Sequence, residues 1–476
     1  MSDTDLEAPV PPAIDDETPP PPAEPSHDED NRLTRDFVDT VVERLEEGDD
    51  EGARALVRPL HPADIADLFE LAPNEWRAPL AAALAELLDG DVLAEMNDWV
   101  RDVVLQALEP QQVAALATEL DTDDAVAIIE DMDIEDQREV LRALDPDDRA
   151  AIEEALSYPE ESAGRLMQRD LIAVPEHWHV GDVLDYLRRN EDLTTDFWEI
   201  YVVDASHHPV GTCKLSWVLR TPRDIAIADI MQREQTLVPV DMDQEEVALR
   251  FQKYALISAA VIDASGRLVG MITVDDVVHI IQQEASEDIL AMSGAGDGDI
   301  NEPLPSTIKT RMWWLFVNLG TAMLASAVVA IFQDTISRLV TLAVLMPIVA
   351  GMGGNAATQT MAVTVRALAT NQLTSSNTLR MIVREWWIAS ANGLGLGALM
   401  AVGCQLVYHD WGLTLVLFLA MLINSLNAGL SGVLIPIGLE KVRIDPAVTS
   451  TVFVTTMTDC MGFFSFLGLA ALFNLH

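Results

Sequence analysis

The first third of the chain has a helical spacing of apolar residues that is repeatedly interrupted. Residues 31–157 contain short segments such as LEPQQVAALATEL, LDTDDAVAIIEDM and DIEDQREVLRAL. Each segment begins with Asp, Glu or Pro in its first turn, and its apolar residues follow at i, i+3 and i+4. This pattern predicts helical hairpins stacked as a small superhelix.

A different repeat occupies residues 158–274. The stretch LMQRDLIAVPEHWHVGDVLDYLRRN, followed by IYVVDASHHPVG, returns as IMQREQTLVPVDMDQEEVALRFQKY, followed by AAVIDASGRLVG. Each copy has strand-like runs around a helical stretch, which predicts two α/β units. The pair resembles the tandem cystathionine-β-synthase-type (CBS) regulatory module.

The resemblance bears on nucleotide binding. The CBS nucleotide signature, G-h-h-[ST]-x-x-D, is met in the second copy by GMITVDD, with Gly270, Thr273 and Asp276. In the first copy, GTCKLSW puts Lys214 and Trp217 at the hydroxyl and acid positions. ATP binding by this module is therefore not predicted.

The last third of the chain is apolar over lengths that span a membrane. Five runs, at about 312–332, 339–364, 386–408, 412–439 and 446–474, can each cross ~30 Å of hydrocarbon at 1.5 Å per residue. An amphipathic helix, TVDDVVHIIQQEASEDILAMSGAG, leads into them. We therefore expect a multidomain membrane protein with a disordered acidic tail (1–30), an α-helical superhelical domain (31–157), an α/β CBS pair (158–274), a connecting helix with its linker (275–304) and a five-helix transmembrane domain (305–476).

The N-terminal and C-terminal parts of the chain differ strongly in net charge. The net charge is −48, yet residues 301–476 hold seven acids and eight Lys or Arg, against 70 and 21 in residues 1–300. Such an acidic half repels nucleic acid and attracts cations, so we expect no nucleic-acid partner. Because only four of the 29 basic residues are Lys, adaptation to a salty cytoplasm explains the excess equally well.

The basic residues also predict an orientation. If residue 300 is cytosolic, the inner loop flanks carry seven of the eight Lys or Arg of the membrane half, and the outer flanks carry only Arg338. By the positive-inside rule, the N-terminal domains are cytosolic and the C-terminus is outside. With no basic and apolar leader, the expected location is the plasma (inner) membrane of a bacterium, crossed several times.

Asp459, in VTTMTDCMGFF, is expected to be the only acid well inside any of the five spans. A charge there costs on the order of 3 kcal/mol, so intramembrane acids usually face a pathway. Helical spacing puts Thr451, Thr455 and Gly462 on the same stripe, with Thr458 beside it. An acid hydrogen-bonded to a neighbouring helix, or kept protonated, is the alternative interpretation.

The second span is expected to break at LMPIVAGMGGNAATQT. Pro347 and the glycines weaken a helix there, and Asn355 offers a polar side chain beside the break. Tight packing of small residues is the alternative.

Oxygen ligands without a Cys/His cluster suit a hard divalent cation such as Mg²⁺, Ca²⁺ or Mn²⁺. Because one acid cannot dehydrate Mg²⁺, the ion is expected to stay hydrated between two copies of Asp459 in a homodimer.

The acids of the connecting helix form the third candidate. Glu284, Glu287 and Asp288 share one helical face and repel one another unless a cation intervenes. A solvated acidic face is the commoner explanation of such a run. The helix, however, joins the acidic domains to the spans, which favours a regulatory role.

The order of these parts resembles the MgtE family of magnesium channels. The most specific pieces are YPEESAGRLM, VDMDQEEV, TVDDV with EASED, GMGGNAATQ and TTMTDCMGFFSFLGLA. The resemblance implies a homodimer in which the connecting helix is a plug and Asp459 binds hydrated Mg²⁺ in the pore. It further implies regulatory Mg²⁺ ligands, with a looser match in the helical domain: Asp243, Glu245, Asp276, Glu284, Glu287, Asp288 and, loosely, Asp123.

The sequence departs from that family at a few positions. His279 and Ala255 stand where acids are expected, which weakens or removes one regulatory site.

The leading hypothesis is a Mg²⁺ channel that cytosolic Mg²⁺ closes. An ion-coupled divalent-cation carrier and a non-conducting membrane sensor of cations or nucleotides are the alternatives. Enzymatic activity is not expected, because no nucleophile and base constellation or Walker-type loop is present.

Overall fold

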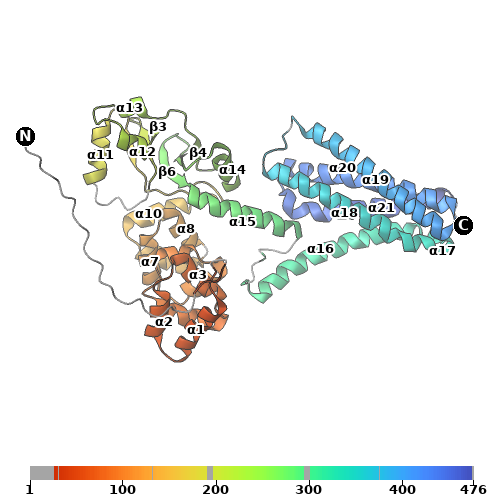
Figure 1. The fold of residues 1–476 in the computed structure, drawn as a ribbon, viewed down its shortest axis with the longest axis horizontal. Coiled ribbons are helices and arrows are strands. Elements are labelled where there is room, and N and C mark those ends of the chain that lie inside the picture. The colour runs from red at the N-terminus through yellow and green to blue at the C-terminus, as the bar shows by residue number, and fades with distance from the viewer. Residues whose placement is uncertain are drawn as a thin grey trace, which may run out of the picture. The chain divides into compact units, whose positions relative to one another are not determined.

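The computed structural model describes residues 26–29, 32–130, 132–189, 197–293, 298, 301–374 and 376–473. The described residues belong to two compact units (Figure 1). One unit comprises Met1–Met242 and Ser258–Ile272, and the other comprises Asp243–Ile257 and Thr273–His476. Most of the tail predicted for residues 1–30 lies outside the described residues.

The N-terminal part of the first unit is entirely helical, as its restarting pattern predicts. Asp49, Asp89 and Asn97 each cap a helix by accepting a backbone N–H at 3.0 Å. One continuous cluster of buried apolar side chains extends from Leu33 to Ala155. The helices are α1 (Arg35–Glu46), α2 (Asp50–Val57), α3 (Pro62–Leu71), α4 (Asn74–Leu84), α5 (Gly90–Ala94), α6 (Asp98–Leu105), α7 (Pro110–Glu119), α8 (Thr122–Glu130), α9 (Ile134–Ala143) and α10 (Pro146–Ala155).

The α/β repeat forms two sheets of the same topology, with strand orders β1-β2-β3 and β4-β5-β6. The first two strands of each sheet are parallel, pairing Ala173 with Tyr201 and Leu237 with Ala260. The strands are β1 (Ala173–Pro175), β2 (Glu199–Val203), β3 (Pro209–Lys214), β4 (Leu237–Pro239), β5 (Ser258–Ile262) and β6 (Leu268–Thr273). The helices are α11 (Val180–Arg189), α12 (Leu215–Arg220), α13 (Ile227–Ile230) and α14 (Gln244–Tyr254).

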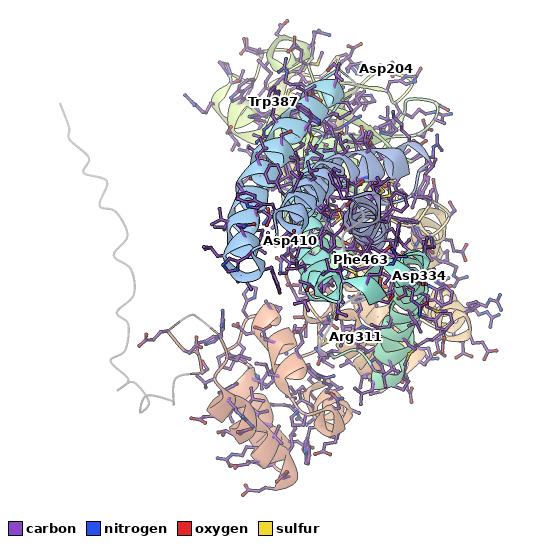
Figure 2. The ribbon with its side chains drawn as sticks, turned by 90° about the vertical axis from the view of Figure 1, so that its right-hand side faces the viewer. Asp204, Arg311, Asp334, Trp387, Asp410 and Phe463 are labelled. Atoms are coloured by element: carbon purple, nitrogen blue, oxygen red, sulfur yellow. The ribbon has the colours of Figure 1, made fainter. Side chains whose placement is uncertain are left out.

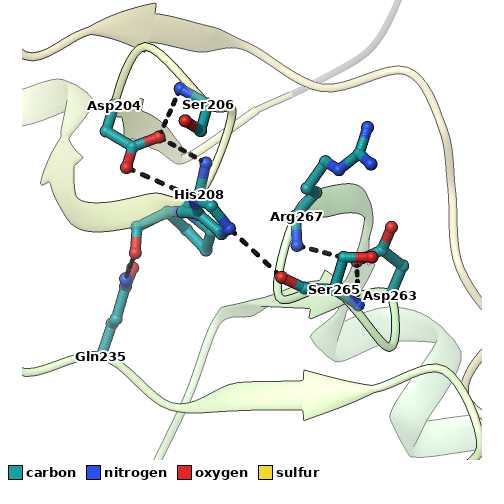
Figure 3. Close-up of polar contacts among 8 residues, drawn as sticks. Asp204, Ser206, His208, Gln235, Asp263, Ser265 and Arg267 are labelled. Atoms are coloured by element: carbon teal, nitrogen blue, oxygen red, sulfur yellow. Dashed lines mark hydrogen bonds and ion pairs between the residues drawn. The ribbon is translucent and has the colours of Figure 1, made fainter.

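The repeated DAS motif makes the same turn in both copies (Figure 3). One carboxylate oxygen of Asp204 accepts the backbone N–H groups of Ser206 and His208, at 2.8 and 2.9 Å. Asp263 accepts those of Ser265 and Arg267 at the same distances. These hydrogen bonds hold the pKa of Asp204 and of Asp263 below its usual range. The turns therefore confirm the internal repeat at the level of side-chain geometry.

Five helices of the second unit are long and apolar enough to cross a membrane, which confirms the predicted number of spans. They are α16 (Leu304–Ile331), α18 (Thr341–Ala369), α19 (Thr378–Tyr408), α20 (Trp411–Lys441) and α21 (Pro446–Leu472), with the short α17 (Gln333–Arg338) after the first. In α20, 56% of the most apolar window is buried, against 6% in α16. Helix α20 is therefore the central helix of the bundle, and α16 lies at its edge (Figure 1).

Helix α15 (Val274–Ser293) ends against the bundle. Its last turn places Ala291 and Met292 on a cluster formed by α18, α20 and α21, which includes Met361, Ala428 and Val454. The Thr451 hydroxyl donates to the Met292 carbonyl oxygen at 2.8 Å. The connecting helix is thus joined to the helix that carries Asp459.

Candidate functional site

Asp459 lies in the middle of α21, half-buried, beside the fully buried Thr458. Its carboxylate has no hydrogen bond or ion pair with the residues that the structure describes. Three threonines of the predicted stripe donate to backbone carbonyls, Thr455 to Thr451 at 2.8 Å among them. A hydroxyl used in this way keeps lone pairs that can accept from water or face a cation. The stripe therefore combines one unneutralised acid with oxygen acceptors.

The second span does not break. Helix α18 is continuous from Thr341 to Ala369 with Pro347 inside it, so the predicted interruption is wrong. Its glycines differ in their surroundings. A Cβ on Gly353 would lie 2.0 Å from Nδ2 of Asn424, whereas Gly351 and Gly354 have open space around them. Gly353 thus admits the Asn424 side chain, which donates to the Val349 carbonyl at 2.9 Å.

Asn355 lies on an exposed part of α18. Among the described residues, no hydrogen bond connects it with Asp459 or Thr455. Its predicted role beside a helix break loses its structural basis, because the backbone there is helical. A place in the pore wall stays a prediction for Asn355.

A second acidic feature lies at the inner end of the bundle. A cavity of about 490 Å³, which we call the acid-lined cavity, is bounded by α14, α15, the ends of α18 and α20, and the start of α21. Six of its lining residues are acids: Asp243, Glu245, Glu246, Asp288, Glu440 and Asp445. Three predicted regulatory residues, Asp243 and Glu245 at the start of α14 and Asp288 of α15, therefore lie in one cavity with acids of the membrane domain.

The electrostatics of this cavity are unfavourable without a cation. Burial, followed by repulsion from Glu284, Asp288, Asp243 and Asp445, raises the pKa of Glu245 to about 7. Burial and then repulsion from Asp445 also raise the pKa of Asp288. Both carboxyls would be more easily ionised if a positive charge lay among them.

The cavity fits a hydrated ion better than a bare one. Within the described residues, no group of three or more His, Cys, Asp or Glu side chains is close enough to hold a metal directly. Each water needs about 10–15 Å³ of such space, so the six waters of a hexahydrated cation need about 60–90 Å³, which is less than the cavity offers. Carboxylates that line a cavity of this size can contact an ion through its waters.

The other predicted regulatory residues lie outside the lining of this cavity. Glu284 accepts from Gln244 Nε2 at 2.8 Å, and exposed Glu287 accepts from Gln283 at 2.8 Å. Asp276 accepts from the Thr273 hydroxyl at 2.6 Å at the start of α15. Asp123 is buried in α8 of the other unit.

Sequence reasoning missed Asp445 and Glu440. Asp445 caps α21 by accepting the Ala447 N–H at 2.7 Å, and Pro446 follows it. That pattern is typical of an ordinary helix start, which conceals a second role. The available signal was position, because both acids lie close to Lys441 and Arg443, between the last two apolar runs.

A second acid of the membrane domain, Glu385, is buried near the inner end of a candidate span. Glu385 is 5% exposed in α19, whose candidate span begins at Thr378. The apolar run starts at Trp386, so a boundary drawn from hydropathy excludes Glu385 by one residue. The helix itself continues through Arg384 and Glu385 into the bundle.

Family models of known proteins match three segments of this chain. Residues 346–469 match the family model described as divalent cation transporter, MgtE, and residues 60–161 match the MgtE intracellular N domain. Residues 227–283 match the CBS domain. The matches cover parts of the helical domain, the α/β repeat and the membrane domain.

Two curated relatives align over almost the whole chain. The magnesium transporter MgtE of Thermus thermophilus is 31% identical over 444 residues, 91% of this chain and 97% of the relative. That of Bacillus subtilis is 28% identical over 453 residues, 93% and 98% of the two chains. Among solved structures, the cytosolic domain of the Mg²⁺ channel MgtE in complex with ATP has 30% identity and a TM-score of 0.47, covering 51% of this chain and 99% of that one.

Proposed function

Because this chain belongs to the MgtE family of magnesium transporters, we propose that it is a channel in which hydrated Mg²⁺ passes Asp459. The observation that carries the proposal is the state of this residue. Its carboxylate lies inside a span, half-buried, without a hydrogen bond or ion pair from the described residues. An acid of this kind is costly unless it serves ions in a pathway.

A second copy of the chain completes the proposed pore. One carboxylate per chain is too little charge to remove the waters of Mg²⁺. Two copies of Asp459 across a two-fold axis, each with Thr455 one turn below, supply two negative charges for one hydrated divalent ion. The proposed assembly is therefore a homodimer whose pore lies between two α21 helices.

The acid-lined cavity is proposed as the regulatory site. Asp243, Glu245 and Asp288 share it with Glu246, Glu440 and Asp445, and cytosolic Mg²⁺ would reduce the repulsion among these six acids. Asp445 extends the set that the family resemblance implies. Because Asp445 begins α21, neutralising this cavity acts directly on the helix that carries Asp459.

Helix α15 offers the mechanical connection. With the cavity neutralised, α14 and α15 are held against the inner end of the bundle, and the Met292–Thr451 hydrogen bond stays in place. Without cations, repulsion among the acids favours separation of α14 and α15 from that end. The gate is then a two-state element whose balance Mg²⁺ shifts.

The number of acids agrees with the free energy that a gate needs. One site at ten times its dissociation constant contributes about 1.4 kcal/mol, and moving a gate from 1:99 to 99:1 requires about 5.5 kcal/mol. About four such sites must therefore act together. Two Mg²⁺ ions in each acid-lined cavity, against its six acids, would supply four such sites in a homodimer.

Flux into liposomes tests the channel. Wild-type protein in proteoliposomes should take up Mg²⁺ down its gradient, and Asp459→Ala should abolish that uptake. Asp334→Ala, which removes an exposed acid of α17, is the matched control and should conduct normally. Full uptake by Asp459→Ala would refute the role of Asp459. No uptake by the wild type would favour a sensor, and uptake that requires a second ion gradient would favour a coupled carrier.

A further inference from the structure

Glu385 is a second acid inside the membrane domain, and the proposed pore does not use it. It is the eighth residue of α19, about 10 Å along the helix axis at 1.5 Å per residue. Its side chain is 5% exposed. The Thr360 hydroxyl of α18 donates to its carboxylate at 3.3 Å, a long hydrogen bond.

The packing around Glu385 leaves an open space. A Cβ on Gly429 of α20 would lie 2.7 Å from the Cβ of Ala389, so α19 and α20 are already in close contact. Beside this contact lies a cavity of about 200 Å³, which we call the Glu385 cavity. Its polar lining comes from three helices: Gln359, Thr360, Arg384, Glu385, Asn392 and Ser425.

The Glu385 cavity is separate from the proposed pore site. The residues that line it come from α18, α19 and α20, and none comes from α21. Among the described residues, no Lys, Arg or His nitrogen lies within 4.0 Å of the Glu385 carboxylate. Arg384 lines the same cavity, but its side chain is exposed. The buried carboxylate therefore faces a cavity of mixed polar and apolar lining, without a direct counter-charge.

We propose that the Glu385 cavity binds one monovalent metal cation, such as Na⁺ or K⁺, with part of its water. Glu385 supplies the counter-charge, and Gln359, Thr360, Asn392 and Ser425 offer uncharged oxygen ligands. The volume is sufficient, because each water needs about 10–15 Å³ of such space. This cavity is a site for a different ion from the one that passes Asp459.

Charge balance selects a monovalent over a divalent ion. One carboxylate neutralises one positive charge, so Na⁺ or K⁺ leaves the site neutral. A divalent ion would leave one positive charge uncompensated inside the bundle. A proton competes for the same carboxylate, and Arg384 is the other titratable side chain in the lining.

Chemical labelling of Glu385 tests the proposal locally. Dicyclohexylcarbodiimide modifies protonated carboxyls in apolar surroundings, and a bound cation excludes the proton. With full-length protein in liposomes, mass spectrometry of the α19 peptide would measure the labelling rate. At constant pH and ionic strength, replacing choline chloride by NaCl or KCl should slow labelling about tenfold at saturation. Thr360→Val should raise the half-protecting concentration severalfold.

The controls separate this site from the pore. Asp459→Asn should lose Mg²⁺ uptake yet keep Na⁺ or K⁺ protection of Glu385, so the two proposals can fail independently. Equal labelling in choline, NaCl and KCl would overturn the cation site. Protection by MgCl₂ alone would overturn its monovalent character.

Thermal unfolding provides a second measurement if Glu385 resists labelling. The melting temperature of the wild type should rise more than that of Glu385→Gln when choline is replaced by Na⁺ or K⁺. This isosteric substitution leaves the many surface acids unchanged, so their general response to salt cancels in the comparison. An equal rise in both proteins would overturn the proposal.

Discussion

Glu245 provides a pH test of the proposed regulatory site. Its pKa of about 7 in the folded chain, against 4.5 without these surroundings, means that the cation-free cavity holds a proton over this range. Burial is the largest cause, and repulsion from neighbouring acids adds to it. The stabilising effect of this proton is complete below pH 4.5 and is lost as the pH rises through 7. Mg²⁺ must displace it, so closure should become easier with rising pH.

The expected change is a shift in the Mg²⁺ concentration that closes half of the channels. For one competing proton with a pKa near 7, that concentration should fall about tenfold between pH 6 and pH 8. In Glu245→Gln the shift should shrink, whereas Asp275→Asn, outside the cavity lining, should retain it. Single-channel recording at several internal pH values measures this. A wild type whose midpoint is independent of pH would contradict the assignment.

Single residues also mark where prediction from the sequence stops. Asp459 was recognisable because it interrupts a long apolar run, and its role in a pore stays a prediction. Glu385 lies one residue before the apolar run that begins at Trp386, so the hydropathy pattern excluded it from the span. Asp445 was not singled out because its position is typical of an ordinary helix cap. Both became visible only when helices distant in sequence were placed side by side.

At the level of the element, α15 should transmit the state of the acid-lined cavity. Replacing its three acids together, by Glu284→Gln, Glu287→Gln and Asp288→Asn, should leave about half of the channels open at an internal Mg²⁺ concentration that closes the wild type. Losing one site per chain removes two sites from the homodimer, which is about 2.8 kcal/mol, or a factor of about 100 in the ratio of closed to open channels. Patch recording of reconstituted protein measures that ratio. Asp275→Asn on the same helix is the control, and normal closure of the triple variant would refute the gating role.

Helix α18 allows a matched comparison of two neighbouring glycines. Gly353→Ala would place a Cβ 2.0 Å from Nδ2 of Asn424 and should destabilise the protein by about 1–3 kcal/mol. Gly354→Ala meets nothing within 4 Å and should stabilise the helix by up to about 1 kcal/mol. Thermal unfolding in detergent distinguishes them. Equal effects would indicate that α18 is not the continuous helix described.

The predicted break in α18 failed for a physical reason. Pro and Gly weaken an isolated helix, but inside a bundle the neighbouring helices can satisfy polar groups and fill the space. Asn424 does both, donating to the Val349 carbonyl against the bare face of Gly353. The α/β repeat and the five spans were predictable because each depends on local periodicity, whereas α18 depends on a partner 71 residues away.

At the scale of the whole molecule, the spans and their loops predict a fixed orientation. Among the described residues, five helices are long and apolar enough to cross the membrane. The loop after α18 is expected inside, as is the one after α20, where Lys441 and Arg443 lie. Figure 2 labels Trp387 and Asp410, which lie towards opposite ends of α19. Trp387 is 65% exposed near the expected inner surface, where the amphipathic indole is favoured at a lipid interface.

Cysteine accessibility tests this orientation directly. The three natural cysteines are buried or partly buried, so a background with all three replaced by Ala should fold. In that background, a membrane-impermeant maleimide added to intact cells should label Ser337→Cys in α17. It should label Gln372→Cys, between α18 and α19, only after the cells are opened. The reverse pattern would place the acidic domains outside, where cytosolic Mg²⁺ could not reach them, and would refute the proposed regulation together with the orientation.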